Sequence, residues 1–213
     1  MNEPALEELK SRVADSVEQD AGLRERVRDL TLQAIKSRSM DSGEIGRVAQ
    51  AVTEGVSLGL GRRKDEIKNA LGEAMAGLDE AVGKAAEASH LALRQLVSQG
   101  KEFSDNDLRL ALDQIKKLER DLLDTLSKVA NSAGDKVQVE FRDFVSHVRR
   151  AGTDTGAKVL ITVEEFSNKA HAVADSGKLT AANAARDVGA RVAEVASGFF
   201  AALSDALQDK SKK

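Results

Sequence analysis

The chain of 213 residues contains 32 alanines and 53 Leu, Ile, Val or Phe residues, but one proline, no tryptophan, no tyrosine and no cysteine. Helix formers dominate and strand formers are scarce, so the composition predicts an all-α protein with enough apolar residues for a core. The net charge of -3 and the aromatic content of 3% argue against nucleic-acid binding, and the lack of cysteine excludes disulfides, thiolate metal sites and cysteine nucleophiles.

The first amphipathic helix is predicted to begin near Pro4, because proline is tolerated in the first turn of a helix. Apolar residues then recur every three or four positions to about Ser37. Gly22 interrupts this pattern and is expected either to end or to bend the helix. The polar residues 39–43 predict a turn and an N-cap for the next helix.

Residues 39–93 can be written as five consecutive units of eleven residues. Eleven residues make about three helical turns, so four positions of each unit form one apolar stripe along a helix. The side chains of this stripe are mostly small, which suits close packing of helices or shallow contact with an apolar surface. We predict a hinge at Gly59 and Gly61, and bending there would decide whether the segment is one long helix or a hairpin.

Glycines occupy two kinds of position in these units. Gly55 and Gly59 border or lie in the apolar stripe, where a missing side chain allows another helix to come near. Gly61, Gly72 and Gly83 share the first position of their units and are predicted to face away from the stripe.

The stretch GVSLGLGRRKDE, residues 55–66, combines glycines with basic residues as phosphate-binding loops do. It fits neither the Walker pattern nor the dinucleotide pattern, because no glycine precedes a Lys-Ser or Lys-Thr pair and no third glycine follows at the required spacing. We therefore interpret it as a loose point of a repeating helix, followed by a charged turn.

A different pattern follows the polar residues 104–107, which predict another N-cap. Leucine, isoleucine and valine recur there every seven residues, a spacing typical of coiled coils. The residues of this predicted interaction seam are Leu108, Ile115, Leu122 and Val129.

Three helices are predicted after the seam. The first two run from Val137 to about Gly152 and from Val159 to Gly177. Residues 159–163 are also a strand candidate, but the spacing of three and four continues beyond them and favours a helix. Thr180 is expected to cap the last helix. The predicted apolar-surface stripe of that helix consists of Val192, Val195, Phe199, Phe200 and Leu203.

Glu87 and His90 match the Glu-x-x-His motif of four-helix proteins with a carboxylate-bridged metal pair. Such a site needs two of these motifs, and the chain contains no second one. A metal protein is therefore the weakest hypothesis, and no cofactor is expected. Motifs of serine hydrolases and zinc proteases are also missing, so the sequence favours a protein that is not an enzyme.

The eleven-residue units of 39–93 and the stretch KLTAANAARDVGARVAEVASGFFAALSDALQ, residues 178–208, resemble the bacterial phasins that coat storage-polymer granules, and more loosely the apolipoproteins. This resemblance implies a non-catalytic amphipathic protein that self-associates or coats an apolar surface of lipid or polymer. It transfers no functional residues, since neither family offers a short motif. The alternative is a soluble scaffold whose heptad seam binds a second copy or another helical protein.

Together these patterns predict an elongated bundle of about five to seven amphipathic helices with coiled-coil-like packing. One domain is expected, with Gly100 as the alternative boundary between halves 1–100 and 101–213. The first ten residues lack the apolar segment of a secretory signal, and the longest charge-free apolar run, 195–204, is too short to cross a bilayer. We therefore expect a cytoplasmic protein without a transmembrane segment.

Overall fold

A computed structural model describes residues 3–19, 21–38, 41–64, 67–98, 105–170 and 181–211. All regular secondary structure within these ranges is helical, so the all-α prediction is confirmed. The helices are α1 (Glu3–Val17), α2 (Leu23–Lys36), α3 (Ser42–Arg62), α4 (Ile67–Ser98), α5 (Asp105–Ser132), α6 (Asp135–Ala151), α7 (Asp154–Ala170) and α8 (Ala181–Ser211). The strand candidate at 159–163 lies inside α7, as the continued helical spacing predicted.

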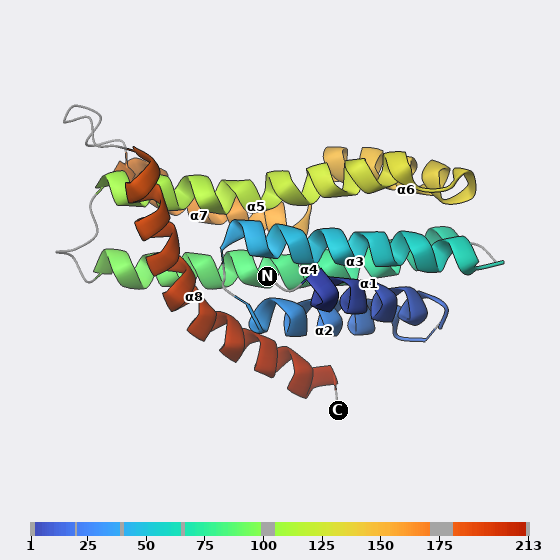
Figure 1. Cartoon of the computed structure of the whole chain (residues 1–213). Helices are drawn as coiled ribbons and strands as arrows, with labels where there is room; N and C mark the ends of the chain where they lie inside the picture. Colours follow the sequence, from blue (N-terminus) through green and yellow to red (C-terminus); the bar gives the residue numbers. More distant parts are fainter. Residues whose placement is uncertain are drawn as a thin grey trace.

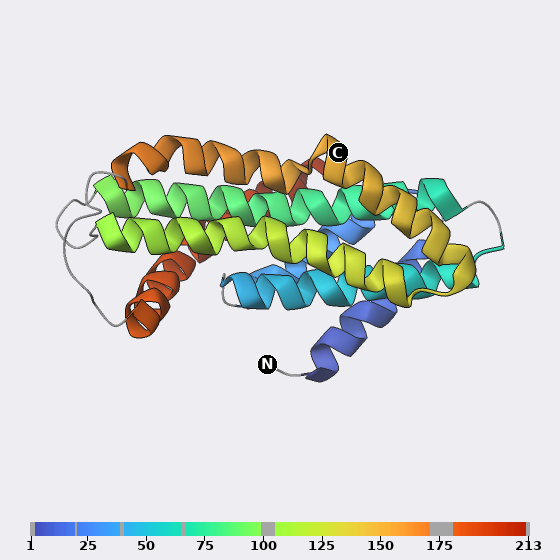
Figure 2. The same ribbon diagram turned by 90° about the horizontal axis from the view of Figure 1, so that it is seen from above.

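The helices form an elongated bundle (Figures 1 and 2). Helices α3, α4, α5 and α7 run roughly along its long axis, and α3 and α4 make an antiparallel hairpin. Helix α1 packs on α3, and α2 packs on α4. Helix α8 crosses the bundle diagonally, over α4 and α5, and its C-terminal part reaches α2 (Figure 1).

Local sequence accounts for several helix ends. Gly22 has a positive φ of 66° just before α2, a conformation that glycine adopts without a steric penalty, so it separates two helices and does not merely bend one. The side chain of Asp41 accepts a hydrogen bond from the backbone N–H of Glu44 and caps α3. Gly152 has a φ of 86° and ends α6, where a helix end was predicted.

The eleven-residue units form a hairpin and not one long helix. Helix α3 continues without a break through Gly59 and Gly61 to Arg62, and α4 begins at Ile67. The predicted hinge therefore lies inside α3, and the chain reverses after it. Arg63, with extended backbone angles, ends the helix.

The apolar faces of the helices meet in one core that includes side chains from α1 through α8. Residues on both sides of the alternative boundary contribute to it, while Gly100 itself lies outside the described residues. Gly177 and Thr180, the predicted end of one helix and cap of the next, also lie outside them. Among the helices that the structure describes, none is both long enough and apolar enough to cross a membrane.

Candidate functional site

The predicted interaction seam lies on α5 and faces the interior of the same chain. Helix α5 packs on α3, α6, α7 and α8. The four seam side chains are only 2–5% exposed and belong to the core; they are Leu108, Ile115, Leu122 and Val129. The seam is thus an intramolecular contact in this structure. A heptad spacing indicates that a stripe is buried, but it does not say whether the partner helix belongs to the same chain.

The predicted apolar-surface stripe lies on α8 and is partly covered by the bundle. Val192 and Phe200 are buried, whereas Val195, Phe199 and Leu203 are only partly buried against the core. Helix α8 therefore docks by its apolar face, although three of the five stripe side chains keep contact with solvent.

Polar contacts add little to the docking of α8. Lys36 Nζ lies 2.6 Å from Asp205 Oδ1, but both side chains are exposed, and such pairs contribute about 0–1 kcal/mol. The hydroxyl of Ser204 is buried without a hydrogen-bond partner in the described part of the chain, which disfavours the docked state. The attachment of α8 consequently depends on apolar contact.

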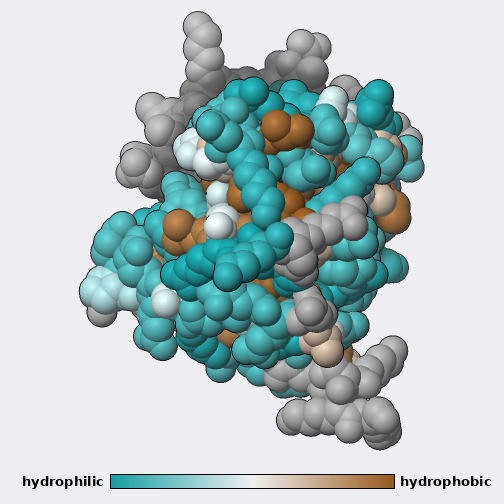
Figure 3. Space-filling model, turned by 90° about the vertical axis from the view of Figure 1, so that its right-hand side faces the viewer, coloured by the Kyte–Doolittle hydropathy of each residue, from teal (hydrophilic) through white to brown (hydrophobic). Residues whose placement is uncertain are grey.

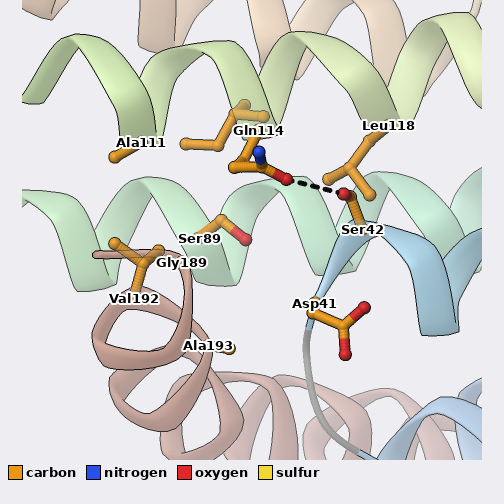
Figure 4. A pocket seen from close by; sticks show the side chains of 10 residues that line it. Asp41, Ser42, Ser89, Ala111, Gln114, Leu118, Gly189, Val192 and Ala193 are labelled. Atoms are coloured by element: carbon orange, nitrogen blue, oxygen red, sulfur yellow. Dashed lines mark hydrogen bonds between the residues drawn. The ribbon is translucent and has the colours of Figure 1, made fainter. Parts of the chain in front are cut away.

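The packing beneath α8 is also incomplete. A cavity of about 30 Å³ lies between α8, α4, α5 and the start of α3, and Figure 4 shows Val192 and Ala193 of α8 on one side of it. Across the cavity, the Ser42 hydroxyl donates a hydrogen bond of 2.9 Å to Gln114 Oε1. A cavity of this size holds about one water molecule, so α8 does not fill the surface that it covers.

In contrast, α1 and α2 pack with their backbones against glycines of the central hairpin. A Cβ atom added to Gly55 or Gly59 would lie 2.5 Å from a carbonyl oxygen of α1, on Lys10 or Ala14. The same atom on Gly77 of α4 would overlap the backbone of α2. The prediction that Gly55 and Gly59 allow a close helix approach is confirmed.

The prediction for the other three glycines holds only in part. A Cβ atom on Gly61 or Gly72 would meet nothing within 4 Å, as expected for positions away from the stripe. Gly83 is buried instead, and its Cβ atom would lie 2.6 Å from Asp154 Oδ2. The expectation was wrong for Gly83 because α7 covers this side of α4, and a pattern within one helix does not reveal a second helix there.

Arg62 and Arg63, which follow Gly61 in the sequence, hold α1 in place. Arg62 Nη1 lies 3.2 Å from Asp15 Oδ1 and 3.0 Å from Glu18 Oε1. Arg63 Nη1 donates to the carbonyl oxygen of Val17. The glycine-rich stretch is part of α3 as far as Arg62, so its backbone N–H groups serve the helix and do not form a phosphate loop.

Glu87, the first residue of the metal motif, is neutralised by two lysines. Its Oε2 atom lies 2.8 Å from Lys84 Nζ and 3.2 Å from Lys158 Nζ. Burial raises the pKa of Glu87, but the hydrogen bonds and charges of these lysines leave the pKa below its ordinary value. A carboxylate held in this way has little capacity left for a metal ion.

His90 faces α7 and not Glu87. Its Nε2 atom lies 3.2 Å from Glu165 Oε2, and its Nδ1 atom lies 3.1 Å from the hydroxyl oxygen of Thr162. Burial lowers the pKa of His90, although the charge of Glu165 acts in the opposite direction. Within the described ranges, no three His, Asp or Glu side chains are arranged to hold a metal ion.

Asp79 of α4 caps the N-terminus of α7, a contact that the sequence did not indicate. Its Oδ2 atom accepts a hydrogen bond of 2.6 Å from the backbone N–H of Asp154. Its Oδ1 atom accepts bonds from the backbone N–H of Thr155 at 3.0 Å and from the Thr155 hydroxyl at 2.7 Å. This cap comes from a residue 75 positions earlier in the chain, so local pattern could not identify it.

Thr153 provides the local part of the same cap. Its hydroxyl oxygen accepts a hydrogen bond from the backbone N–H of Gly156, and the hydroxyl donates to Glu119 Oε2 at 2.6 Å. Burial raises the pKa of Glu119, and the charge of Asp79 raises it further, against the effect of the Thr153 hydrogen bond. These polar groups are used within the chain and fix α7 to α4 and α5.

Two features left for an external partner are apolar. Leu160 and Ile161, adjacent on α7, are 56% and 58% exposed. The α8 stripe is half-covered. A surface of this kind suits contact with other apolar groups and offers no reactive side chain of its own.

The chain belongs to a family of unknown function designated DUF6781, whose pattern matches residues 1–209. Comparison with curated proteins and with solved structures gave no match.

Proposed function

We propose that this member of a family of unknown function is a non-catalytic helical protein that coats an apolar surface of lipid or storage polymer, as its resemblance to phasins implies. The observation that carries the proposal is the docking of α8, which presents an apolar stripe to the bundle but buries it incompletely. We further propose a cytoplasmic location, a reducing compartment that the cysteine-free sequence fits.

Moving α8 from the bundle to an apolar surface exchanges one apolar contact for another. Val195, Phe199 and Leu203 keep contact with solvent in the bundle and lose it on an apolar surface, and each Å² of apolar area buried in this way contributes about 25 cal/mol. The exposed pair between Lys36 and Asp205 is lost, at a cost of about 0–1 kcal/mol. The exchange is therefore favourable where an apolar surface covers the rest of the stripe.

In water, by contrast, we expect α8 to stay docked. The parts of α4 and α5 beneath it include buried Ser89, Ala111 and Ile115, which would become exposed if α8 left. A lipid or polymer surface would cover this face together with the stripe, whereas water would not. Opening is therefore coupled to binding.

We also propose that copies of this protein associate with one another on the lipid or polymer surface that they coat. The adjacent side chains of Leu160 and Ile161 on α7 support it, because they are more than half exposed in the single chain. A soluble scaffold that binds through the heptad seam has less support, since that seam is already buried by helices of the same chain.

Flotation with triolein droplets covered by phosphatidylcholine tests the proposal. We expect the unmodified protein to float with the droplets and a Val195→Ser, Phe199→Ser variant to remain largely in the lower fraction. The matched control replaces two exposed apolar residues of α3 and α6, Leu58 and Val139, by Ser, and should float as well as the unmodified protein. Circular dichroism in solution should show that all three proteins are helical.

Two outcomes would overturn the proposal. One is an unmodified protein that does not float. The other is equal flotation of the α8 variant and the control variant, which would mean that the stripe makes no contact with the droplet.

A further inference from the structure

A groove between α4 and α6, separate from α8, contains two adjoining cavities. The inner cavity has a volume of about 170 Å³ and the outer one about 490 Å³. Gly72 and Phe144 line both, so the two cavities meet at these residues. Figure 3 views the end of the bundle where the chain turns from α5 to α6, and it shows apolar surface recessed between hydrophilic side chains.

The inner cavity is apolar on most sides. Its large side chains come from α4, α5 and α6, and they are Met75, Leu78, Leu122, Leu126, Phe144 and Val148. A dry cavity of about 150 Å³ with similar walls binds benzene, so this one can hold a single ring or a short alkyl chain. Methionine adapts to ligands of different shape, which favours a binding cavity over a rigid void.

The outer cavity is acidic. Three carboxylates, those of Glu73, Glu140 and Asp143, line it with one ammonium group, that of Lys68, and with His147. None of the three carboxylates has an ion-pair partner within the described residues, although salt bridges are numerous elsewhere on the surface. Unpaired charges of one sign around a concave site attract a ligand of the opposite sign.

Phe144 lies where the apolar and the acidic cavities meet. Its ring is half-buried and lines both. A cation near the face of an aromatic ring is attracted by the ring quadrupole, so this position suits the junction between a cationic head and an apolar body.

We propose that this groove binds a small amphiphile, with its apolar chain or ring in the inner cavity and a cationic head group among the carboxylates of the outer cavity. An anionic amphiphile of the same length binds more weakly, because its head group would face Glu73, Glu140 and Asp143. The site does not depend on the contact of α8 with an apolar surface.

Isothermal titration calorimetry with octyltrimethylammonium, below its micelle concentration, tests the site. We expect saturable binding of one molecule per chain. Octanesulfonate, with the same chain and an anionic head, should bind at least about five-fold more weakly, as expected for two net charges at contact distance in a solvated site. Equal affinity for the two probes, or binding without saturation, would contradict the proposal.

A cavity-filling variant locates the site. Gly72→Leu places a side chain in the groove without disturbing the backbone, because a Cβ atom there meets open space. The matched control is Gly61→Leu on α3, where a Cβ atom also meets nothing within 4 Å but the residue lines neither of these two cavities. Binding of octyltrimethylammonium should fall at least about ten-fold in the first variant and be unchanged in the second. Unchanged binding in Gly72→Leu would place the ligand elsewhere and overturn the proposal.

A charge variant tests the head-group contact. Glu140→Gln with Asp143→Asn should reduce the preference for the cationic probe, whereas Glu8→Gln with Asp124→Asn removes the same charge from exposed positions outside the groove and should leave it unchanged. An equal effect of both double variants would show that only the overall charge matters, which contradicts a defined site.

Discussion

Helix α4 is closed against two of its neighbours and open towards a third. At Gly77 the backbone of α2 comes so near that no side chain fits, and near Asp79 and Gly83 the start of α7 is held by hydrogen bonds. At Gly72 the helix faces cavities, because α6 does not approach it as closely. Glycines of one helix thus serve both tight backbone contact, at Gly77, and an open groove, at Gly72, on different faces of that helix.

The difference arises from what the neighbouring helices contribute. Helix α2 approaches α4 with its backbone. Because Gly77 of α4 has no side chain, the two helices come into contact over a larger area. Helix α6 instead faces α4 with the large side chain of Phe144, which lines both cavities. The same helix can thus be a rigid support on one side and a binding surface on the other.

The largest expected effect comes from placing a side chain in the tight contact between α2 and α4. In Gly77→Ala the new methyl group would overlap the carbonyl oxygen of Arg24 and lie 3.0 Å from the backbone N of Arg28. Because backbone atoms cannot turn away as side chains do, we expect a loss of about 2–3 kcal/mol and a fall in Tm of about 5–10 °C, measured by thermal circular dichroism. An unchanged Tm would mean that α2 does not press on α4 at this position.

Removal of the α7 cap is expected to have the next largest effect. Asp79→Ala removes the acceptor of three hydrogen bonds from Asp154 and Thr155, which should cost about 2 kcal/mol. Hydrogen exchange should accelerate mainly in the first turn of α7. Uniform acceleration across the bundle would argue that Asp79 stabilises the whole core and not this helix end.

At Gly72 we expect a substitution to raise the free energy of unfolding and not to lower it. Gly72→Ala adds a methyl group that meets open space and removes the flexibility of glycine from the unfolded chain, so we expect a gain of about 1 kcal/mol. Urea unfolding of this variant, side by side with Gly77→Ala, measures both signs on one helix. A loss of stability in Gly72→Ala would contradict the open groove.

The smallest expected effect is a pH dependence at the α7 contact. Because burial raises the pKa of Glu119, the folded state holds the proton more tightly than the unfolded state. The contribution of Glu119 therefore favours folding at low pH and is lost as the pH rises from the ordinary carboxyl range, about 4.3, through the raised pKa. The amide introduced by Glu119→Gln does not ionise, so this variant lacks the pH-dependent contribution.

We accordingly expect Glu119→Gln to melt slightly above the unmodified protein at about pH 7, with the difference vanishing at about pH 4. Glu8→Gln, at an exposed position of α1, is the control and should show no such trend. A Tm difference of Glu119→Gln that does not change with pH would contradict the raised pKa.

Sequence patterns predicted the helices well, because apolar spacing and capping residues act over a few positions. The spacing identified the helix at 159–163, and Asp41 lies within the turn where a cap was expected. The patterns could not identify the partner of each face. The seam of Leu108 and Ile115 is buried by helices of the same chain, and Gly83 faces α7.

The remaining features depend on contacts between distant parts of the chain. Asp79 and Thr155 are 76 positions apart, and the groove is lined by side chains from α4, α5 and α6. Neither leaves a local signal, since an aspartate inside a helix and a glycine in a repeat each have many explanations. Contacts of this kind can be identified only when the arrangement of the helices in space is known.

The proposed release of α8 from the bundle can be tested most directly by preventing it. The chain contains no cysteine, so Lys36→Cys with Asp205→Cys provides two unique thiols at side chains that contact each other. A short bismaleimide would join α8 to α2, and the same variant capped with N-ethylmaleimide is the control. We expect the capped protein to float with triolein droplets and the cross-linked protein to remain in the lower fraction. Equal flotation of both would contradict it.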